Sequence, residues 1–176
     1  RKKRKPKMLY EETAEYFSRC VILAKIFTAV MKCEAVYHVS QGRGMHRIYP
    51  KTEKPRNIET NAAPQKIGWF YLLPDMLYFD DMDYPFLLLK DVHVSVAAMH
   101  YTTATPTKDC DVIAQTWLHT NKDGSRDLRY KENPPVFTCL YGLVTLQTQY
   151  GFIEKFALSN LQLAREIEAL IAQMSE

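Results

Sequence analysis

The sequence predicts an α+β fold: an antiparallel β-barrel or sandwich of about seven strands, with a long N-terminal helix and a C-terminal capping helix. Short apolar segments separated by turn residues fill the second half of the chain, as in a β-rich domain. Apolar residues recur at steps of three and four near the two ends, which indicates helices there. With 47% hydrophobic and 24% charged residues in a chain of 176, a core of its own can be buried.

The first helix is predicted from Met8 to about Lys32. Glutamates lie in its first turns, near the positive end of the helix dipole, and Lys32 lies near the negative end. Both placements stabilise a helix. A face this broad must be buried, and we expect it to pack on the following domain rather than on another helix. Its apolar seam consists of Tyr16, Cys20, Leu23, Phe27 and Val30, widened by Phe17, Val21, Ala24 and Met31.

The middle of the chain predicts short strands at Val36–Val39 and His46–Tyr49, followed by a long exposed loop. Gly142 marks a bulge or bend in the longest predicted strand, and Asp123-Gly124 predicts a tight hairpin turn. The later strands are expected at "GWFYLL", "MLYF", "PFLLL", "DVHVSVAAMHYTT", "CDVIAQTWLHT", "RDLRY", "VFTCLYGLVTLQTQ" and "FIEKFAL".

The final segment, "SNLQLAREIEALIAQM", predicts an amphipathic helix. Ser159 and Gln162 fit a capping box, in which each side chain satisfies a free backbone N–H of the other residue. One face of this helix is apolar, and it can plug an open end of the sheet. That face contains Leu163, Ile167, Leu170, Ile171 and Met174.

Three stretches, "GWFYLLPDMLYFDD", "FLLLKDVHVSV" and "FALSNLQLAREIEALI", occur in the order of two strands, a further strand pair and a terminal helix. This pattern, over Val36–Met174, resembles the pleckstrin-homology-like superfold, including its GRAM-type and bacterial relatives. The resemblance implies a binding or adaptor scaffold whose ligand is left open. Family members that bind phosphoinositides have several cations after the first strand, and neither Gln41–Arg47 nor Pro74–Asp75 supplies them. We expect Arg43, His46 and Arg47 to face a partner.

The N-terminal run "RKKRKPK" concentrates positive charge. Six cations, Arg1, Lys2, Lys3, Arg4, Lys5 and Lys7, leave 17 against 20 acidic residues, so the remaining chain has a net charge of about −3. A protein that binds nucleic acid across its surface is usually basic itself. The run can bind an anionic lipid surface, contact nucleic-acid phosphates, serve as a nuclear address, or be only a solvated joint.

No residue pattern of high specificity for catalysis or metal binding occurs. The sequence lacks GxSxG, HExxH and GxxxxGK[ST], and its four cysteines contain no CxxC pair, so we expect reduced thiols. Asp80, Asp81 and Asp83 are expected to form an acidic turn rather than a cation site. His93 and His100 are seven residues apart, so they face opposite sides of a strand and cannot share one ion.

These observations divide the chain into a basic tail or linker (1–7), an N-terminal helix (8–34) and a β domain with its C-terminal helix (35–176). We expect a non-enzymatic binding or adaptor module of a larger cytoplasmic protein, with no cofactor and no metal. Its expected partners are another protein or a neighbouring domain, a second copy through the N-terminal helix, and an anionic membrane surface through the basic run. The alternative is a nucleic-acid-binding accessory domain.

Overall fold

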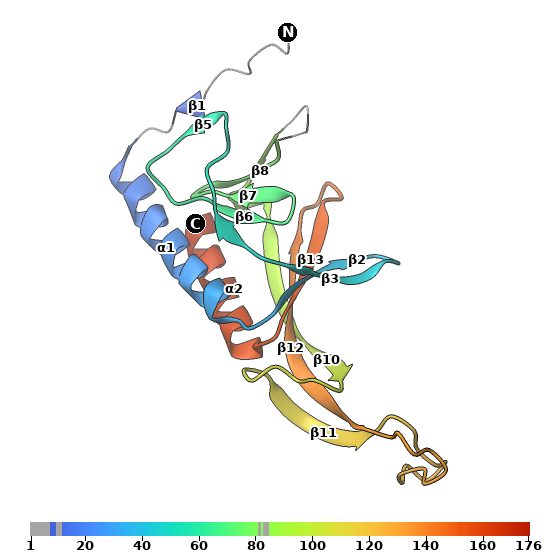
Figure 1. The fold of residues 1–176 in the computed structure, drawn as a ribbon. Helices are drawn as coiled ribbons and strands as arrows, with labels where there is room; N and C mark the ends of the chain where they lie inside the picture. The colour runs from blue at the N-terminus through green and yellow to red at the C-terminus, as the bar shows by residue number, and fades with distance from the viewer. Residues whose placement is uncertain (1–7, 10–11, 81, 83–84) are drawn as a thin grey trace.

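The computed structural model describes residues 8–9, 12–80, 82 and 85–176, and these form an α+β fold (Figure 1). The elements are β1 (Met8–Leu9), α1 (Ala14–Lys32), β2 (Val36–Ser40), β3 (Gly44–Ile48), β4 (Lys51–Thr52), β5 (Ile58–Glu59), β6 (Gln65–Ile67), β7 (Phe70–Leu72), β8 (Met76–Tyr78), β9 (Phe86–Leu88), the 3-10 turn η1 (Leu89–Asp91), β10 (His93–Thr103), β11 (Asp111–Trp117), β12 (Pro135–Gln147), β13 (Ile153–Leu158) and α2 (Leu161–Ser175).

Two antiparallel sheets contain nearly all the strands. The larger has the order β10-β12-β13-β2-β3, with β11 also pairing with β12, and the smaller has the order β4-β6-β7-β8-β9. Among the described residues neither sheet closes on itself, so the expectation of a closed barrel is wrong. The strands of the smaller sheet are two or three residues long, which is too short for the continuous pairing that closure requires.

Helix α1 is shorter than the sequence predicts. Thr13 is its N-cap, and its side chain accepts a hydrogen bond from the Tyr16 N–H at 3.1 Å. Such a cap sets the first helical turn, so the helix begins at Ala14 rather than at Met8. Met8 instead starts the two-residue strand β1, which pairs in parallel with β5.

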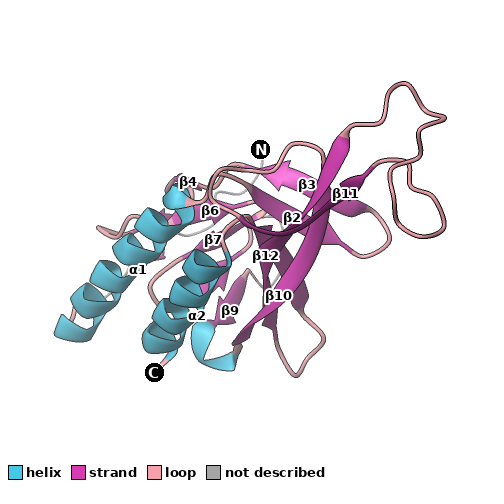
Figure 2. Cartoon of the chain, turned by 90° about the horizontal axis from the view of Figure 1, so that it is seen from below, coloured by secondary structure: helices cyan, strands magenta, loops and turns pink. Residues whose placement is uncertain are grey.

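The two helices lie side by side on one side of the larger sheet (Figure 2). Helix α2 packs on β10, β12 and β13, and α1 packs along α2, so α1 belongs to the same core as the strands. Helix α1 therefore does pack on the domain that follows it, as expected, but it does so mainly through another helix, α2. Residues buried in this shared core include Leu23, Ile26 and Val30 from α1, Ile167, Ile171 and Met174 from α2, and Val144, Phe156, Phe70 and Leu77 from the two sheets.

The apolar seam predicted for α1 is only partly buried. Leu23 and Val30 lie in the core as expected, whereas Phe17, Val21 and Met31, expected to widen the seam, are 50%, 57% and 57% exposed. The helix is apolar on two faces, and α2 covers one of them.

The N-cap of helix α2 lies one residue after the predicted cap, Ser159. Asn160 is the N-cap, and its side-chain oxygen accepts a hydrogen bond from the Leu163 N–H at 2.9 Å. Ser159 is used elsewhere: its hydroxyl accepts from the Ala35 N–H and donates to the Asp109 carboxylate, both at 2.9 Å. The buried Ser159 therefore ties the start of α2 to the chain leaving α1, and the predicted capping box is wrong.

Strand β12 is the longest of the described strands, and helix α2 packs against it at Gly142. A Cβ atom at this position would lie far closer than 3.0 Å to the Cβ atom of Ala164 on α2. Only glycine lets the helix approach the strand this closely. Gly142, which the sequence marks as a bulge or bend, is the contact point between helix and sheet.

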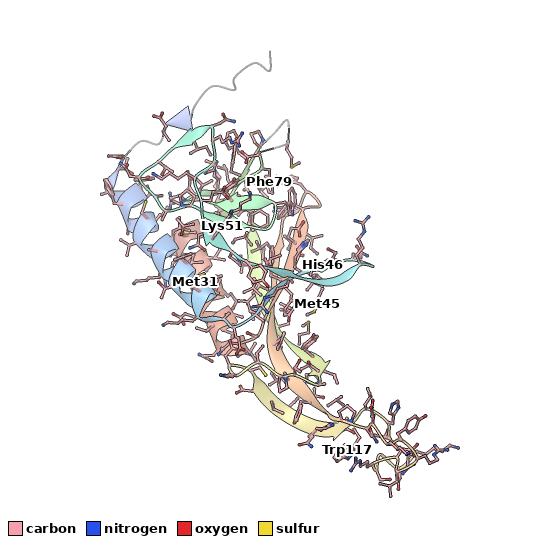
Figure 3. The ribbon with its side chains drawn as sticks, in the orientation of Figure 1. Met31, Met45, His46, Lys51, Phe79 and Trp117 are labelled. Carbon is pink, nitrogen blue, oxygen red and sulfur yellow. The ribbon has the colours of Figure 1, made fainter. Side chains whose placement is uncertain are left out.

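The lower end of β12, together with β11, forms an arm that extends away from the body (Figure 1). The predicted strand "RDLRY" does not form in this arm, where only an isolated bridge joins Thr120 and Arg126. Side chains organise the segment instead: Asn133 exchanges two hydrogen bonds with the His119 backbone at 2.8 Å, and the rings of His119 and Tyr130 stack at 3.8 Å. Trp117 lies where β11 enters this segment (Figure 3).

We expect Gly142→Ala to lower the free energy of unfolding by about 1–3 kcal/mol, because the new methyl group overpacks the contact with Ala164. Urea unfolding followed by circular dichroism measures this loss.

The matched control is Ala164→Gly, which removes the opposing methyl group but adds a glycine to α2 at a cost of about 1 kcal/mol. In the double variant the clash is absent. The free energy of unfolding should therefore fall by less than the sum of the two decreases in the single variants. Strictly additive losses would show that the two positions do not limit the approach of the helix.

Candidate functional site

A row of cross-strand neighbours leads from the core to the hairpin formed by β2 and β3. Val144 pairs with Phe156, Phe156 with His38, and His38 with His46. Residues paired in this way lie on the same face of a sheet, here the face that α2 covers. The hairpin extends beyond the helices, with His46 on its outer strand (Figures 1 and 3). Partly exposed polar side chains therefore continue the buried apolar row.

Three polar side chains meet on this hairpin, on the half that leads to its turn. The His38 Nε2 atom is hydrogen-bonded to the Glu154 carboxylate, and the His38 Nδ1 atom lies 3.4 Å from the Ser40 hydroxyl. The side chains of His38 and Glu154 are only 24% and 15% exposed. The ring of His38 also packs against the ring of Phe156, at 5.4 Å between centroids. The imidazole is thus held on three sides.

A cleft of about 520 Å³ opens at this point, where β2 and β13 separate. The ladder between the two strands ends at the pair Val39 and Lys155, and their remaining residues diverge. Ser40 and Glu154 both line the cleft, together with His38, Val39, Gln41, Ile153 and Lys155.

The structure separates the three residues expected to face a partner. Arg43 is exposed in the hairpin turn, where its backbone N–H donates to the Ser40 carbonyl at 3.2 Å. His46 lies opposite His38 in the β2–β3 ladder. Arg47 points to the opposite face, donates to the Glu34 carbonyl and covers the Tyr37 ring at 5.6 Å. Arg47 therefore has a structural contact, and of the three residues only His46 is a cross-strand neighbour of a member of the polar group, His38.

That opposite face carries an aromatic cluster. The rings of Tyr37, Tyr101 and Tyr141 contact one another, and the centroid of Tyr141 lies 6.3 Å from that of Tyr37 and 4.8 Å from that of Tyr101. Burial raises the pKa of Tyr141 well above its usual range. Burial, with a smaller contribution from the neighbouring Cys110 thiol, raises the pKa of Cys139 to about 11. The cluster is a small second core, because its central groups are buried and neutral.

A second surface lies on the outer side of α1. Its residues recur at steps of four and three, the spacing of a coiled-coil seam. We name this surface the α1 stripe; it comprises Phe17, Val21, Ala24, Thr28 and Met31, all exposed. Lys25 and Lys32 follow one edge of the stripe at a spacing of seven and are also exposed.

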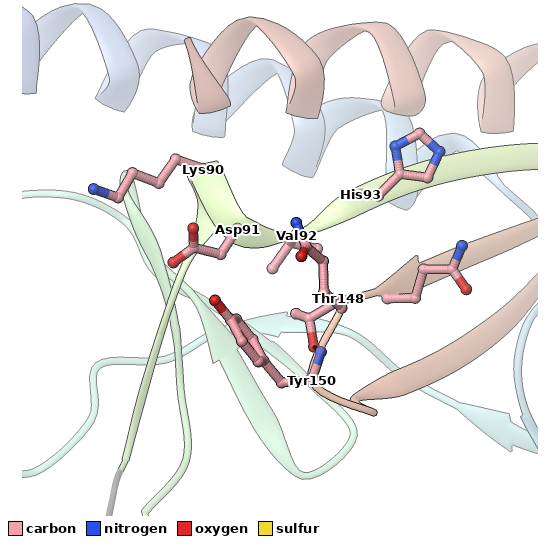
Figure 4. A pocket seen from close by; sticks show the side chains of 8 residues that line it. Lys90, Asp91, Val92, His93, Thr148 and Tyr150 are labelled. Carbon is pink, nitrogen blue, oxygen red and sulfur yellow. Dashed lines mark hydrogen bonds between the residues drawn. The ribbon is translucent and has the colours of Figure 1, made fainter.

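A polar cleft of about 550 Å³ lies between the start of β10 and the turn after β12 (Figure 4). Lys90, Asp91, His93, Thr148 and Tyr150 contribute to its walls. Lys90 and His93 point away from each other, so the charged and titratable groups do not converge on one point (Figure 4).

The six basic residues of positions 1–7, and Asp81 and Asp83 of the acidic turn, lie outside the described residues. Across the described part of the chain, His, Cys, Asp and Glu do not gather in groups of three that suit a metal ion. In the same residues, neither helix combines the length and the apolar content needed to cross a membrane. The four cysteines are free thiols.

Comparison with protein-family models, with curated proteins and with solved structures gives no match for this chain. The resemblance to pleckstrin-homology-like domains therefore stays a prediction.

The sequence did not predict the polar group that His38, Ser40 and Glu154 form at the hairpin. His38 and Ser40 are two residues apart in "YHVS", which places them on one face of a strand, but a strand with this pattern is common. Glu154 is 116 residues from His38, and only the pairing of β13 with β2 brings the two together.

Because two of the thiols are buried, we expect the folded state to lose stability at alkaline pH. Burial raises the pKa of Cys33 from about 9 to about 12, and that of Cys139 to about 11. Both thiols stay protonated in the folded state after they ionise in the unfolded state. Their stabilising contribution is therefore full below pH 9 and is lost as the pH rises from 9 towards 12.

Urea unfolding at about pH 8 and about pH 10 measures this loss. A Cys33→Ala/Cys139→Ala variant should lose less stability over that interval than the parent chain. An equal loss in the two proteins would contradict the assignment to these thiols.

Proposed function

We propose that this chain is a binding or adaptor module that docks a helix of a partner protein through the α1 stripe. One observation carries the proposal: Phe17, Val21 and Met31 are at least half exposed although α1 is already packed along α2. Exposed apolar side chains scattered singly need no explanation, but a contiguous row at helical spacing is typical of an interaction site.

The fold itself does not need the stripe. The other side of α1 supplies Leu23, Ile26 and Val30 to the core, and this burial holds the helix in place. Two faces of one helix are thus apolar, and only one has a partner within the described chain. A second helix laid along the stripe would bury its residues as knobs in the holes of a coiled-coil-like pair.

The charge beside the stripe favours an acidic partner helix. Lys25 and Lys32 occupy the flanking heptad position that faces the flanks of a docked helix. Carboxylates at the partner's flanking positions would pair with these ammonium groups. A second copy of α1 would instead set the lysines against each other or against Cys20 and Phe27, because the one acidic residue within α1, Glu15, is bonded to Arg19.

The charge of the chain agrees with a protein partner better than with nucleic acid. Without residues 1–7 the net charge is about −3, which opposes binding to a phosphate backbone. In this proposal the basic run is a separate element that would bring the module to an anionic surface inside the cell. Docking at the α1 stripe does not require it.

The probe is a synthetic peptide of about three heptads with leucine at the a and d positions and glutamate at the flanking e and g positions. We expect it to bind the full chain, and a peptide with lysine in place of glutamate to bind about tenfold more weakly. Val21→Glu places a charge in the stripe and should weaken binding of the acidic peptide by tenfold or more. Fluorescence anisotropy of labelled peptides measures all three binding affinities.

Ile113→Glu is the matched control, because Ile113 is 48% exposed on β11, away from α1, and its replacement should leave binding unchanged. A chain lacking residues 1–7 should also bind normally. Equal binding of the two peptides, or an unaffected Val21→Glu variant, would contradict the proposal. So would a concentration-dependent dimer that Val21→Glu abolishes, since the stripe would then belong to a second copy.

A further inference from the structure

We propose that Ser40, His38 and Glu154 form a nucleophilic site that accepts an acyl group from small esters. This activity is independent of docking at the α1 stripe, and it revises the expectation of a module without chemistry. The roles are a serine nucleophile, a histidine base and a glutamate that positions the base, a set that recurs on unrelated folds and is recognised by geometry.

The strands place the three groups. His38 and Ser40 are two residues apart on β2 and therefore project from the same face of the strand. Glu154 lies on the neighbouring strand β13, one pair beyond the last ladder pair, Val39 and Lys155. Because the β2–β13 ladder fixes the register, the carboxylate lies beside the imidazole.

The hydrogen bonds set the proton positions that the chemistry needs. A carboxylate only accepts, so the proton of neutral His38 resides on Nε2 and is donated to Glu154. The Nδ1 atom is then unprotonated and can accept the proton of the Ser40 hydroxyl, 3.4 Å away. Such contacts are often loose without substrate and tighten when it binds. Packing of the ring against Phe156 limits rotation of the base.

The cleft gives a substrate access to the hydroxyl. It measures about 520 Å³, and both Ser40 and His38 form part of its wall. Val39 and Ile153 provide apolar wall for an acyl chain, and Lys155 provides a cation at the rim. A small acyl ester fits this combination better than a polymer.

The reaction is an acyl transfer followed by hydrolysis. The Ser40 oxygen attacks the ester carbonyl carbon while its proton passes to His38 Nδ1. The tetrahedral intermediate breaks the bond to the leaving oxygen, which takes that proton and departs as the alcohol. Water then attacks the acyl-serine with His38 as base, and this releases the acid and restores the serine. Glu154 stabilises the imidazolium that forms in both steps.

The direct test is reaction of the full chain with a fluorophosphonate, which phosphonylates activated serines, followed by peptide mass spectrometry. We expect the adduct on Ser40, and Ser18, Ser95, Ser125, Ser159 and Ser175 serve as internal controls. Ser40→Ala should abolish the adduct, and His38→Gln should slow labelling by about 100-fold or more. Ser18→Ala, at an exposed serine of α1, should label at the parent rate.

Glu154→Gln tests the positioning role, because it keeps the shape of the side chain and removes the charge. Without the carboxylate the imidazolium that forms during proton transfer is less stable, so the labelling rate should fall, and Glu154→Asp, which keeps a carboxylate, should restore part of it. Labelling of Ser40 no faster than of the other serines would overturn the proposal. So would parent-like labelling of His38→Gln, or a Glu154→Gln variant with an unchanged labelling rate.

Discussion

The close approach of α2 to β12 at Gly142 is the contact on which the rest of the structure depends. Because a side chain at this position would overlap Ala164, the helix can lie directly on the sheet only where the strand has a glycine. The apolar residues of α2 then meet those of β10, β12 and β13, and α1 packs along the side of α2 that remains. One small residue thus sets the order of sheet, second helix and first helix.

This order leaves two surfaces uncovered, and each is the site of one of the two proposed functions. Helix α1 lies outermost, so its second apolar face has no cover within the described chain. The helices also end short of the β2–β3 hairpin, so the row that is apolar at Val144 and Phe156 becomes polar and accessible at His38. The position of α2 therefore determines where the chain can meet a partner helix and where a small molecule can reach a serine.

Local signals predicted the helices and most long strands, because periodicity and turn residues act over a few positions. Contacts between residues distant in sequence determined the features that were not predicted. Helix α1 has two apolar faces, and the sequence could not indicate which of them α2 would cover. Ser159 fits an N-cap as well as Asn160 does, but it is occupied by Ala35 and Asp109. Closure of the sheet and the meeting of His38 with Glu154 depend on strand pairing, which no local pattern encodes.

Native-state amide hydrogen exchange tests most directly whether α2 and β12 form one unit. If their contact organises the fold, the buried amides of α2, β12 and β13 should exchange with a single free energy of opening, equal to that of global unfolding. The arm of β11 and its loop, which has few core contacts, should exchange at lower free energy. Exchange of α2 well before β12 would show that the sheet stands without the helix, and would contradict this account.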